Sequence, residues 1–497
     1  MREKTGSKDI VLRIYESFLQ HQKRYAFCID DKMYTYEELG QRIAVIREQL
    51  AFLDSKIIGL VANDDIDTYA SILALWMEGM CYVPLHPEQP LARCEDIISQ
   101  VGLSRILDSS KITRYGGLQV IATSVLSGHK ALVAPKKNVS KNDPAYILFT
   151  SGSTGRPKGV CITFSNVDTF VDSFEALGFH LNEEDRCLQM FDLTFDLSVG
   201  SFLPPLLYGA CAYTIKPGRV KWQEAFRLLD DYKLTFALMV PSVIHYLRPY
   251  LDEIEAPQMR YSLFCGEALA AEDVALWQHS VPNAEIWNVY GPTENTIYCT
   301  AYRMPETDMK TSNGILSIGK KMKNTGTIIV DDQHREVPIG VKGELCLSGS
   351  QLTPGYWDNE EKTKESVFYL NETKWYLTGD ICSMTEDGDI LYYGRKDSQV
   401  KIQGYRIELS EIECVARRFY EEKVATVAVP IQKSQDNTTI ALAVEKHDEG
   451  PEDKLLEYLK CYLPAYMIPS DVIPMPQFPQ NANNKIDRKK IKLLIQQ

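Results

Sequence analysis

Hydrophobic and polar residues alternate between helical and strand spacing over roughly the first 140 positions of the chain. Apolar side chains from Leu39 to Leu50 recur at intervals of three and four residues, which predicts a helix. Thr35 and Glu38 precede it as a capping box, in which each side chain satisfies a backbone N–H of the other residue. Apolar runs predict strands at residues 57–61 and 81–85, with a helix at 70–77 between them. This order predicts a parallel sheet covered by helices.

Short apolar strands continue the pattern at residues 145–150, 235–240, 262–265 and 285–289. After about residue 315 the spacing changes to short alternating strands with glycine turns, which predicts an appended antiparallel region. From about residue 397 we expect strands at 400–402, 426–429 and 440–444, a helix capped by Ser410 and a helix at 452–462. The chain is therefore expected to be an α/β protein with a large N-terminal domain, residues 1–396, and a small mobile α+β C-terminal domain, residues 397–497.

Composition excludes several classes of protein. The 497 residues include 44% hydrophobic and 24% charged positions, which are ordinary globular values. The net charge of −13 argues against a nucleic acid partner, so any phosphate site must be a local arrangement of donors. None of the 12 cysteines forms a CxxC pair, and the amino-terminal segment has no apolar signal core. We expect a cytoplasmic protein without membrane insertion.

The segment 146–160 carries the clearest chemical signal. It reads Tyr-Ile-Leu-Phe-Thr-Ser-Gly-Ser-Thr-Gly-Arg-Pro-Lys-Gly-Val, an apolar strand followed by a loop of hydroxyls, glycines and a lysine. Glycines let backbone amides approach phosphate oxygens, while hydroxyls and a lysine add donors and positive charge. The spacing is not that of a Walker A loop, and the alternative is a flexible surface hairpin. We favour a phosphate-binding loop with Thr150, Ser151, Thr154 and Lys158 as its donors.

Four later motifs extend this signal in a recognisable order. They are Asn-Val-Tyr-Gly-Pro-Thr-Glu at 288–294, Tyr-Leu-Thr-Gly-Asp at 376–380, the segment 394–406, and Asn-Lys-Ile-Asp-Arg at 484–488. Together with the loop they resemble the adenylate-forming superfamily, which includes acyl-CoA synthetases, luciferases and the adenylation domains of nonribosomal peptide synthesis. The resemblance covers nearly the whole chain. It implies that a carboxylate attacks the α-phosphorus of ATP, that diphosphate leaves, and that a thiol then takes the acyl group.

The resemblance also implies roles for individual residues. Lys485 is expected to bridge the substrate carboxylate and the nucleotide as the catalytic lysine, because two anions must meet in this reaction. Glu294 is expected to be the second catalytic residue and to hold Mg²⁺ with the triphosphate. The expected ATP-binding residues are Thr150, Ser151, Thr154, Lys158, Asn288, Tyr290, Thr293, Asp380 (for the ribose hydroxyls) and Arg395. Taken singly, each is an ordinary surface or core residue, and only the shared motifs favour these roles.

Asp196 indicates the kind of acid that is activated. It lies in the segment 191–199, which we interpret as strand and loop and in which amino-acid-activating relatives carry an aspartate for the substrate ammonium group. A carboxylate in an apolar pocket is costly unless it meets a cation, although a capping or turn aspartate is the alternative. The motif places the pocket at Asp196, Leu197, Gly200, Leu238, Leu263, Cys265, Val289, Ile297 and Tyr298. No second charge is available there, so the substrate side chain should be apolar or absent.

Finer resemblance is to the D-alanine–D-alanyl carrier protein ligases. It rests on Phe-Cys-Gly-Glu at 264–267, Phe-Asp-Leu-Ser-Val at 195–199 and the segment 463–469. In those enzymes the cysteine matched by Cys265 presses on the substrate α-carbon, which makes D-alanine the first candidate substrate. Gly200 replaces a bulkier residue and Tyr298 a small one. These changes either compensate in volume or admit glycine, serine, proline or a larger residue.

The acceptor is expected to act in trans, because no segment with a phosphopantetheine-attachment serine follows Lys485. It is a small acidic carrier protein with a phosphopantetheine thiol, or coenzyme A. Asp397 resembles the hinge of the family, and Gly404 is expected to line the thiol tunnel after domain rotation, unless it is a simple turn glycine. We expect a monomer. The alternatives are a stand-alone peptide-synthesis adenylation enzyme for another amino acid, an acyl-CoA ligase, and a degenerate copy that only binds.

Overall fold

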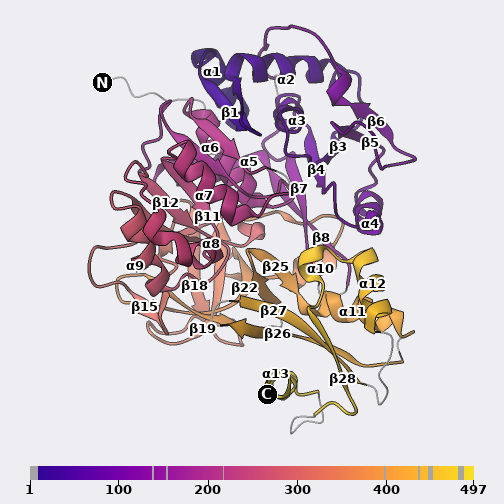
Figure 1. Ribbon diagram of the computed structural model, residues 1–497, viewed down its shortest axis with the longest axis vertical. Helices are drawn as coiled ribbons and strands as arrows, with labels where there is room; N and C mark the ends of the chain where they lie inside the picture. The colour runs from indigo at the N-terminus through magenta and orange to yellow at the C-terminus, as the bar shows by residue number, and fades with distance from the viewer. Residues whose placement is uncertain are drawn as a thin grey trace. The chain divides into compact units, whose positions relative to one another are not determined.

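The computed structural model describes residues 9–136, 139–152, 155–216, 218–396, 399–421, 423–434, 437–445, 452–479 and 486–496 (Figure 1). The chain divides into two compact units, each built from separate segments. The first unit comprises Met1–Pro87, Gly102–Leu148 and Gly159–Gly394. The second unit comprises Glu88–Val101, Phe149–Lys158 and Arg395–Gln497. The second unit therefore includes the predicted phosphate loop as well as the C-terminal part of the chain.

A nine-stranded sheet forms one layer within the described residues of the first unit. Six of its strands are parallel, in the order β13-β12-β11-β9-β10-β1, and antiparallel strands flank them on both sides. The strands, in sheet order, are β17 (Lys320–Lys321), β14 (Thr300–Arg303), β13 (Glu285–Tyr290), β12 (Tyr261–Phe264), β11 (Phe236–Met239), β9 (Arg186–Gln189), β10 (Cys211–Thr214), β1 (Tyr25–Ile29) and β2 (Lys32–Thr35). Parallel strands buried on both faces explain the continuous apolar runs in the sequence.

A seven-stranded sheet repeats the architecture in the amino-terminal half of the chain. Its strands are β20 (Gly355–Tyr356), β8 (Lys158–Thr163), β7 (Pro144–Thr150), β4 (Cys81–Leu85), β3 (Ile57–Val61), β5 (Arg105–Asp108) and β6 (Gln119–Ala122). Strands β7, β4, β3, β5 and β6 are parallel. One continuous cluster of buried apolar side chains runs through both parallel sheets and the helices that cover them.

The helices of the first unit lie between and around these sheets (Figure 1). They are α1 (Ile10–Gln20), α2 (Tyr36–Leu50), α3 (Ile66–Met77), α5 (Phe164–Glu175), α6 (Asp196–Leu207), α7 (Lys221–Asp231), α8 (Ser242–Leu247), α9 (Ala271–Ser280) and α10 (Glu360–Glu365), with short 3₁₀ turns η1 (Thr123–Val125), η2 (Arg248–Glu253) and η3 (Thr293–Asn295). Helix α6 packs on β9 and β10 and is buried from Asp196 to Leu206. This central helix carries the first residues of the predicted amino acid pocket.

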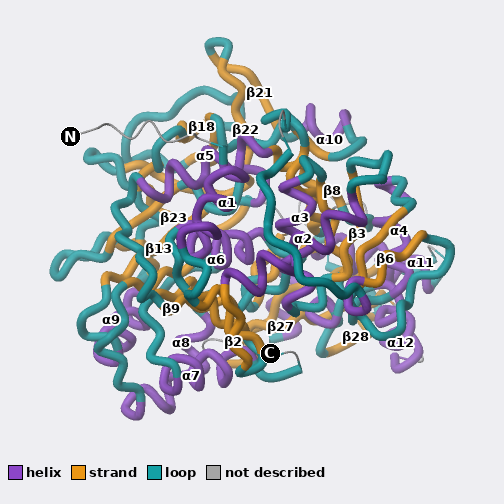
Figure 2. Tube along the Cα trace, turned by 90° about the horizontal axis from the view of Figure 1, so that it is seen from above, coloured by secondary structure: helices purple, strands orange, loops and turns teal. Residues whose placement is uncertain are grey.

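An antiparallel five-stranded sheet follows, as the glycine-rich alternation predicted. It consists of β18 (Thr325–Val330), β19 (Gly343–Gly349), β22 (Thr373–Met384), β21 (Val367–Leu370) and β23 (Ile390–Arg395). Figure 2 shows β18, β21 and β22 near one another. A short hairpin of β15 (Thr311–Ser312) and β16 (Ile315–Leu316) precedes it.

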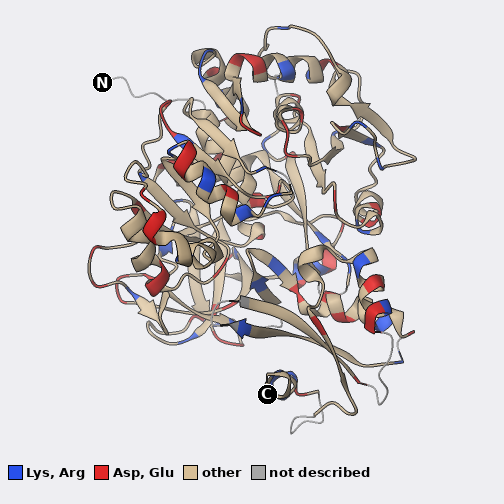
Figure 3. Cartoon of the chain, viewed as in Figure 1, with Lys and Arg blue, Asp and Glu red and all other residues tan. Residues whose placement is uncertain are grey.

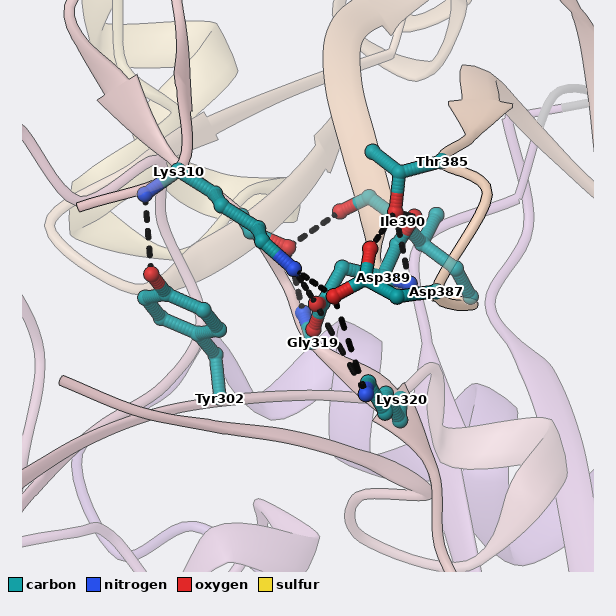
Figure 4. Close-up of polar contacts among 9 residues, drawn as sticks. Tyr302, Lys310, Gly319, Lys320, Thr385, Asp387, Asp389 and Ile390 are labelled. Carbon is teal, nitrogen blue, oxygen red and sulfur yellow. Dashed lines mark hydrogen bonds and ion pairs between the residues drawn. The ribbon is translucent and has the colours of Figure 1, made fainter. Parts of the chain in front are cut away.

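Lys310 joins the antiparallel sheet to the edge of the nine-stranded sheet (Figure 4). Its ammonium contacts the carboxylates of Asp387 and Asp389 in the turn between β22 and β23. Lys320, on the edge strand β17, lies 3.9 Å from the same Asp389 carboxylate. The backbone amide of Lys310 donates to the hydroxyl of Tyr302 on β14. These contacts fix the position of the turn between β22 and β23. Strand β22 carries a predicted nucleotide-binding residue.

The second unit is an α+β arrangement. It contains α4 (Leu91–Val101), the hairpin β24 (Gln399–Ile402) and β25 (Tyr405–Glu408), α11 (Leu409–Phe419), the sheet β26 (Thr426–Ser434), β27 (Asn437–Glu445) and β28 (Asp471–Met475), α12 (Glu452–Tyr462), η4 (Ala465–Met467) and α13 (Arg488–Ile495). Strand β27 pairs antiparallel with β26 and parallel with β28. Buried apolar side chains from α11, α12 and the sheet form its own core.

Most predicted elements are confirmed, and two local interpretations are wrong. The capping box of Thr35 and Glu38 is present at the start of α2. The segment 191–199 contains no strand, because β9 ends at Gln189 and helix α6 begins within the segment at Asp196. That helix is buried nearly all round, so its sequence shows no amphipathic spacing. Helix α11 begins at Leu409 rather than after a Ser410 cap, and no side chain caps it.

Charged residues of both signs are interspersed along the helices (Figure 3). Of the twelve cysteines, ten are buried, Cys414 is partly exposed and Cys461 is exposed, and none forms a disulfide. In the part of the chain that the structure describes, no helix is both long enough and apolar enough to cross a bilayer.

Candidate active site

The residues predicted from the sequence fall into both units. The first unit holds the predicted amino acid pocket and most of the predicted nucleotide contacts, and the second holds the phosphate loop, Arg395 and Gly404. Thr154, Asp397 and Lys485 lie outside the described residues.

Asp196 is a buried carboxylate at the first position of α6. Its Oδ2 atom has no hydrogen-bond partner among the described residues. The pKa of Asp196 is raised to about 6, chiefly by burial. The charge of Glu294 contributes to this rise, whereas hydrogen bonds from the Thr293 side chain and from the amides of Leu197 and Ile297 limit it. A carboxylate in these surroundings is stabilised by a cation that reaches its free oxygen.

Gly200 lies one helical turn after Asp196 on α6, and neighbouring side chains fill the space next to its Cα. A methyl group placed on Gly200 would lie 3.0 Å from Ile297 Cγ2 and 3.7 Å from Tyr298 Cε1. Leu238 Cδ2 would lie 3.6 Å away. Tyr298 is fully buried, its ring contacts Phe170 edge-on at 5.0 Å, and its hydroxyl has no partner among the described residues. The volume that glycine leaves at position 200 is therefore taken up by its neighbours, Tyr298 among them.

The other predicted pocket residues are all buried apolar side chains. They are Leu197 on α6, Leu263 on β12, Cys265 directly after β12, and Val289 on β13. Burial raises the pKa of Tyr298 well above its usual value, and the proximity of Cys265 adds to the shift. Apart from Asp196, the chain brings no charged side chain from this predicted set to the pocket.

The predicted pocket residue Ile297 lies in a strained turn. Thr296 and Ile297 have φ angles of 53° and 73°, in the left-handed region that β-branched residues rarely adopt. The fully buried side-chain amide of Gln351 donates to the carbonyls of Asn295, Thr296 and Tyr298 at 3.2, 3.3 and 3.0 Å. Gln351 thus holds a backbone conformation that the local sequence alone would not adopt.

Two predicted nucleotide-binding residues meet directly. The hydroxyl of Tyr290, at the end of β13, donates to Asp380 Oδ2 on β22. Burial, followed by the charge of Asp380, raises the pKa of Tyr290 well above its usual value, so the phenol stays a donor. Asn288 donates from Nδ2 to the carbonyl of Ser317 at 2.9 Å and so fixes the backbone at Ser317. A carboxylate has two oxygens that can accept from hydroxyl groups, which makes Asp380 a suitable candidate for binding a ribose.

Glu294 offers the oxygen chemistry that Mg²⁺ prefers. Its carboxylate is fully buried and accepts a hydrogen bond from the Tyr356 hydroxyl at 2.7 Å. No group of three or more His, Cys, Asp or Glu side chains is close enough to hold a metal within the described residues. A single carboxylate fits Mg²⁺ here, because this ion commonly takes one or two carboxylates together with nucleotide phosphates.

The phosphate loop begins at the end of β7. The Thr150 hydroxyl is buried without a hydrogen-bond partner among the described residues. The Ser151 hydroxyl donates to the carbonyl of Arg406 at 2.8 Å and accepts from the amide of Glu408 at 3.1 Å. Lys158 is the first residue of β8. The loop is thus in contact with the β24–β25 hairpin inside the second unit.

Gly404 lies in the turn of that hairpin. Gln403 and Gly404 have φ angles of 51° and 79°, as a tight two-residue hairpin turn requires. Arg395 ends β23, just before the predicted hinge. Arg488, the last residue of the 484–488 motif, pairs with the buried carboxylate of Glu413 and donates to the Ala428 carbonyl at 2.8 Å. Arg488 anchors the chain after the predicted catalytic lysine.

A buried carboxylate among apolar side chains and a loop rich in hydroxyl groups and glycine are features expected of an enzyme that activates an acid with a nucleotide. Residues 15–357 match the AMP-binding enzyme family, so the chain belongs to that family of adenylate-forming enzymes.

The chain is also similar to individual proteins of known name. The chain is 32% identical over 483 residues to tyrocidine synthase 3 of Brevibacillus parabrevis, covering 93% of this chain but only 7% of that much longer protein. It is 30% identical over 477 residues to zwittermicin A synthase ZmaJ of Bacillus cereus, covering 93% of this chain and 90% of that protein. It resembles the Vibrio cholerae adenylation domain AlmE, solved in complex with glycyl-adenosine-5′-phosphate, with a TM-score of 0.87 and 27% identity over 100% of this chain and 99% of that one.

Sequence reasoning missed three residues that shape the site. Gln351 holds the strained turn of the pocket, and Glu411 and Arg93 form a buried ion pair next to the phosphate loop. Gln351 stands outside every recognised motif. Glu411 stands immediately after Ser410, which was interpreted only as a helix cap.

Proposed function

We propose that this chain activates a small amino acid with ATP and transfers it to a phosphopantetheine thiol. The amino acid carboxylate attacks the α-phosphorus of ATP, the bond to the β-phosphate breaks, and diphosphate leaves. The thiol then attacks the aminoacyl carbonyl and AMP leaves. The observation that carries this proposal is the unpartnered Oδ2 of Asp196 in an otherwise apolar pocket, because an α-ammonium group is the cation that such a site accepts.

The close packing around Gly200 supports a small substrate. Ile297, Leu238 and Tyr298 take up the space, which favours the interpretation that Gly200 and Tyr298 compensate in volume. D-alanine remains the first candidate because of the resemblance around Cys265. Glycine is the second candidate, because the similar structure of AlmE is a complex with glycyl-adenosine-5′-phosphate.

The remaining roles follow from the sequence motifs and the geometry. Asp380 accepts the ribose hydroxyls beside Tyr290, and Glu294 would hold Mg²⁺, which would screen the charge of the triphosphate. Lys485 neutralises the two anions that must meet, and such a contact contributes about 4 kcal/mol at about 4 Å and an effective dielectric of about 20. Rotation at Asp397 then exchanges Lys485 for the Gly404 turn. The acceptor is a separate small acidic carrier protein, and the compartment is the cytoplasm, consistent with twelve free cysteines.

Exchange of labelled diphosphate into ATP tests the proposal. D-alanine, L-alanine, glycine, serine, proline and larger amino acids are compared, and we expect exchange with the smallest ones. Asp196→Ala should abolish it, whereas Asp192→Ala, which removes a partly exposed carboxylate paired with Lys221, should not. Exchange with no amino acid at all, or full activity of Asp196→Ala, would refute the assignment.

The role of Lys485 is tested by separating the two half-reactions. Lys485→Ala should slow adenylation by about 10²–10³-fold, as loss of a preorganised charge-stabilising group does in other enzymes. Transfer from preformed adenylate should slow much less. Lys489→Ala is the matched control. Equal losses in both half-reactions would contradict the proposed alternation.

A further inference from the structure

The pairing of strands β19 and β22 is interrupted next to Asp380. The register of the two strands shifts between Glu344 and Cys346 of β19. As a result, residues 378–380 of β22 lie opposite the single residue Leu345, which makes this segment a β-bulge. A bulge turns a side chain away from the direction that regular pairing would give it, and bulges are common beside active sites for that reason. The conformation of this bulge therefore determines the direction in which the Asp380 carboxylate points.

Two side chains bond to the backbone of the bulge, where the regular ladder of hydrogen bonds is broken. The amide of Gly379 donates to Glu344 Oε1 at 2.9 Å. The Thr378 hydroxyl donates to the carbonyl of Leu345 at 2.7 Å and accepts from the amide of Asp380 at 3.0 Å. Because backbone donors need a partner when they are taken out of water, these two side chains stabilise the bulge.

The surroundings of Asp380 favour one conformation of the bulge. Asp380 is 3% exposed, and Leu345, opposite it, is fully buried in the same apolar cluster as Tyr290. Gly379 has a φ angle of 76°, a left-handed conformation that glycine adopts without strain. Tyr290 holds the carboxylate of Asp380, and Glu344 holds the backbone amide of the residue before it.

The bond from Glu344 to the backbone affects how Asp380 can meet a ligand. A hydrogen bond from a backbone amide to a carboxylate is stronger than one between neutral groups. Since Gly379 directly precedes Asp380, a rotation of the peptide that joins them would turn the Asp380 side chain. One carboxylate accepts from two neighbouring hydroxyl groups only when both of its oxygens face them. The orientation of this carboxylate therefore decides how well a ribose is distinguished from a deoxyribose.

We propose that Glu344 is a positioning residue that fixes the bulge of β22, so that Asp380 accepts both hydroxyl groups of the ribose and the enzyme selects ribonucleotides over deoxynucleotides. This inference rests on the proposed role of Asp380 in binding the nucleotide. It adds that the selection of ribose depends on a carboxylate of the neighbouring strand, which acts through the Gly379 amide.

Calorimetric binding of AMP, 2′-deoxy-AMP and 3′-deoxy-AMP tests this inference and needs no amino acid substrate. We expect the unsubstituted chain to bind AMP about tenfold more tightly than either deoxynucleotide, the size of one hydrogen bond to a charged group. In Glu344→Ala this preference should fall to about twofold, because a carboxylate that is no longer oriented gains little from the second hydroxyl. A merely structural role would weaken the three nucleotides alike. A preference that stays at about tenfold, whether or not overall binding is weaker, would overturn the inference.

Three further variants sharpen the test. Glu344→Gln keeps an acceptor oxygen for the Gly379 amide and should restore a preference for AMP of about fivefold, since the neutral bond is weaker. Glu386→Ala removes an exposed carboxylate in the turn after β22 and is the matched control, which should keep the full preference. Should Glu344→Ala not fold, Thr378→Val removes the hydroxyl that bonds to both sides of the bulge and should lower the preference in the same way. An undiminished preference in Thr378→Val would then overturn the inference.

The inference and the proposed function fail in different ways. If no amino acid supports diphosphate exchange while Glu344→Ala loses the preference for ribose, the proposed substrate is wrong and the inference holds. If exchange proceeds normally while Glu344→Ala keeps the preference, the inference is wrong and the proposed function holds. If the unsubstituted chain binds no AMP, both are refuted.

Discussion

The hydroxyl of Tyr290 donates a hydrogen bond to Asp380 Oδ2 over 2.5 Å, although 90 positions separate the two residues in the chain. Tyr290 ends a central strand of the nine-stranded sheet, and Asp380 lies on β22 of the antiparallel sheet. Both were predicted to bind the nucleotide. Their contact joins the appended antiparallel sheet to the end of a parallel strand at the proposed nucleotide site.

Tyr290→Phe tests the importance of this contact. The aromatic ring remains, but Asp380 loses the donor that orients its carboxylate. We expect the KM for ATP to rise by about 5- to 10-fold with little change in the KM for the amino acid, the size typical of one hydrogen bond to a charged group. Diphosphate exchange measures both constants. Tyr302→Phe, which removes a hydroxyl that accepts from Lys310, is the control. An unchanged KM for ATP would show that Asp380 needs no positioning.

Amino acid binding should depend on pH through Asp196. Burial raises the pKa of this carboxyl to about 6, and only its ionised form attracts an ammonium group. We expect kcat/KM for the amino acid to fall about tenfold per pH unit below pH 6, while the KM for ATP changes less. The measurement is diphosphate exchange from pH 5 to 8. A flat profile through pH 6 would contradict the proposed ion pair.

The same carboxylate should destabilise the free enzyme at neutral pH. Because its pKa is about 6 in the folded state and about 3.9 in an unfolded chain, the folded state binds more protons between these values. The favourable contribution present at low pH is lost as the pH rises to 6, and it amounts to about 2–3 kcal/mol. Asp196→Asn should therefore raise the Tm at pH 7 while abolishing activation. Thermal unfolding with and without the substitution checks this, and a lower Tm would contradict the free-oxygen assignment.

Much of the fold could be predicted from local patterns. The strands at 57–61 and 81–85, the helix at 452–462 and the capping box of Thr35 occur as the spacing indicated. Helix α3 was predicted only in part, at residues 70–77. It begins earlier, at Ile66, with Asp65 as its N-cap. Helix α6 could not be identified, because its residues are buried from Asp196 to Leu206 and show no polar face. The spacing of apolar residues indicates which face of an element is exposed to water. It gives no such indication for an element that is buried on all faces.

The candidate site was predictable as far as its motifs extend. The aspartate at 196 and the pair Tyr290–Asp380 stand in recognised motifs, and the structure buries all three side chains. Gln351 could not be predicted, since its role depends on carbonyl groups of a turn that is more than fifty residues away. A side chain that donates to backbone carbonyls does not require a particular residue type at the partner position, so the sequence holds no recognisable pair. Such a contact becomes visible only when the strands that carry it are assembled.

Gln351→Met tests the support of the strained turn. Methionine fills a similar volume but removes the amide that donates to three carbonyls, and it leaves them buried without that donor. We expect a loss of stability of about 2–3 kcal/mol and a kcat/KM for the amino acid lowered by about 10-fold or more, with discrimination between small and larger amino acids weakened. Gln333→Met, in an exposed turn, is the control. Unchanged selectivity would show that the turn holds its conformation unaided.

Tyr298 should set the upper limit on substrate size. Tyr298→Ala removes the ring that fills the pocket beside Gly200, so small amino acids should lose about 10-fold in kcat/KM and larger apolar ones should become substrates. The cavity should also cost about 3–5 kcal/mol of stability, as truncation of a buried aromatic residue does. Tyr298→Phe is the matched control: its hydroxyl has no partner among the described residues, so its loss should leave activity unchanged and stability unchanged or higher. Exchange assays over glycine, alanine, leucine and phenylalanine measure the profile of each variant. If Tyr298→Ala still rejected leucine, the limit would lie elsewhere in the pocket, and Ile297 would be the next residue to truncate.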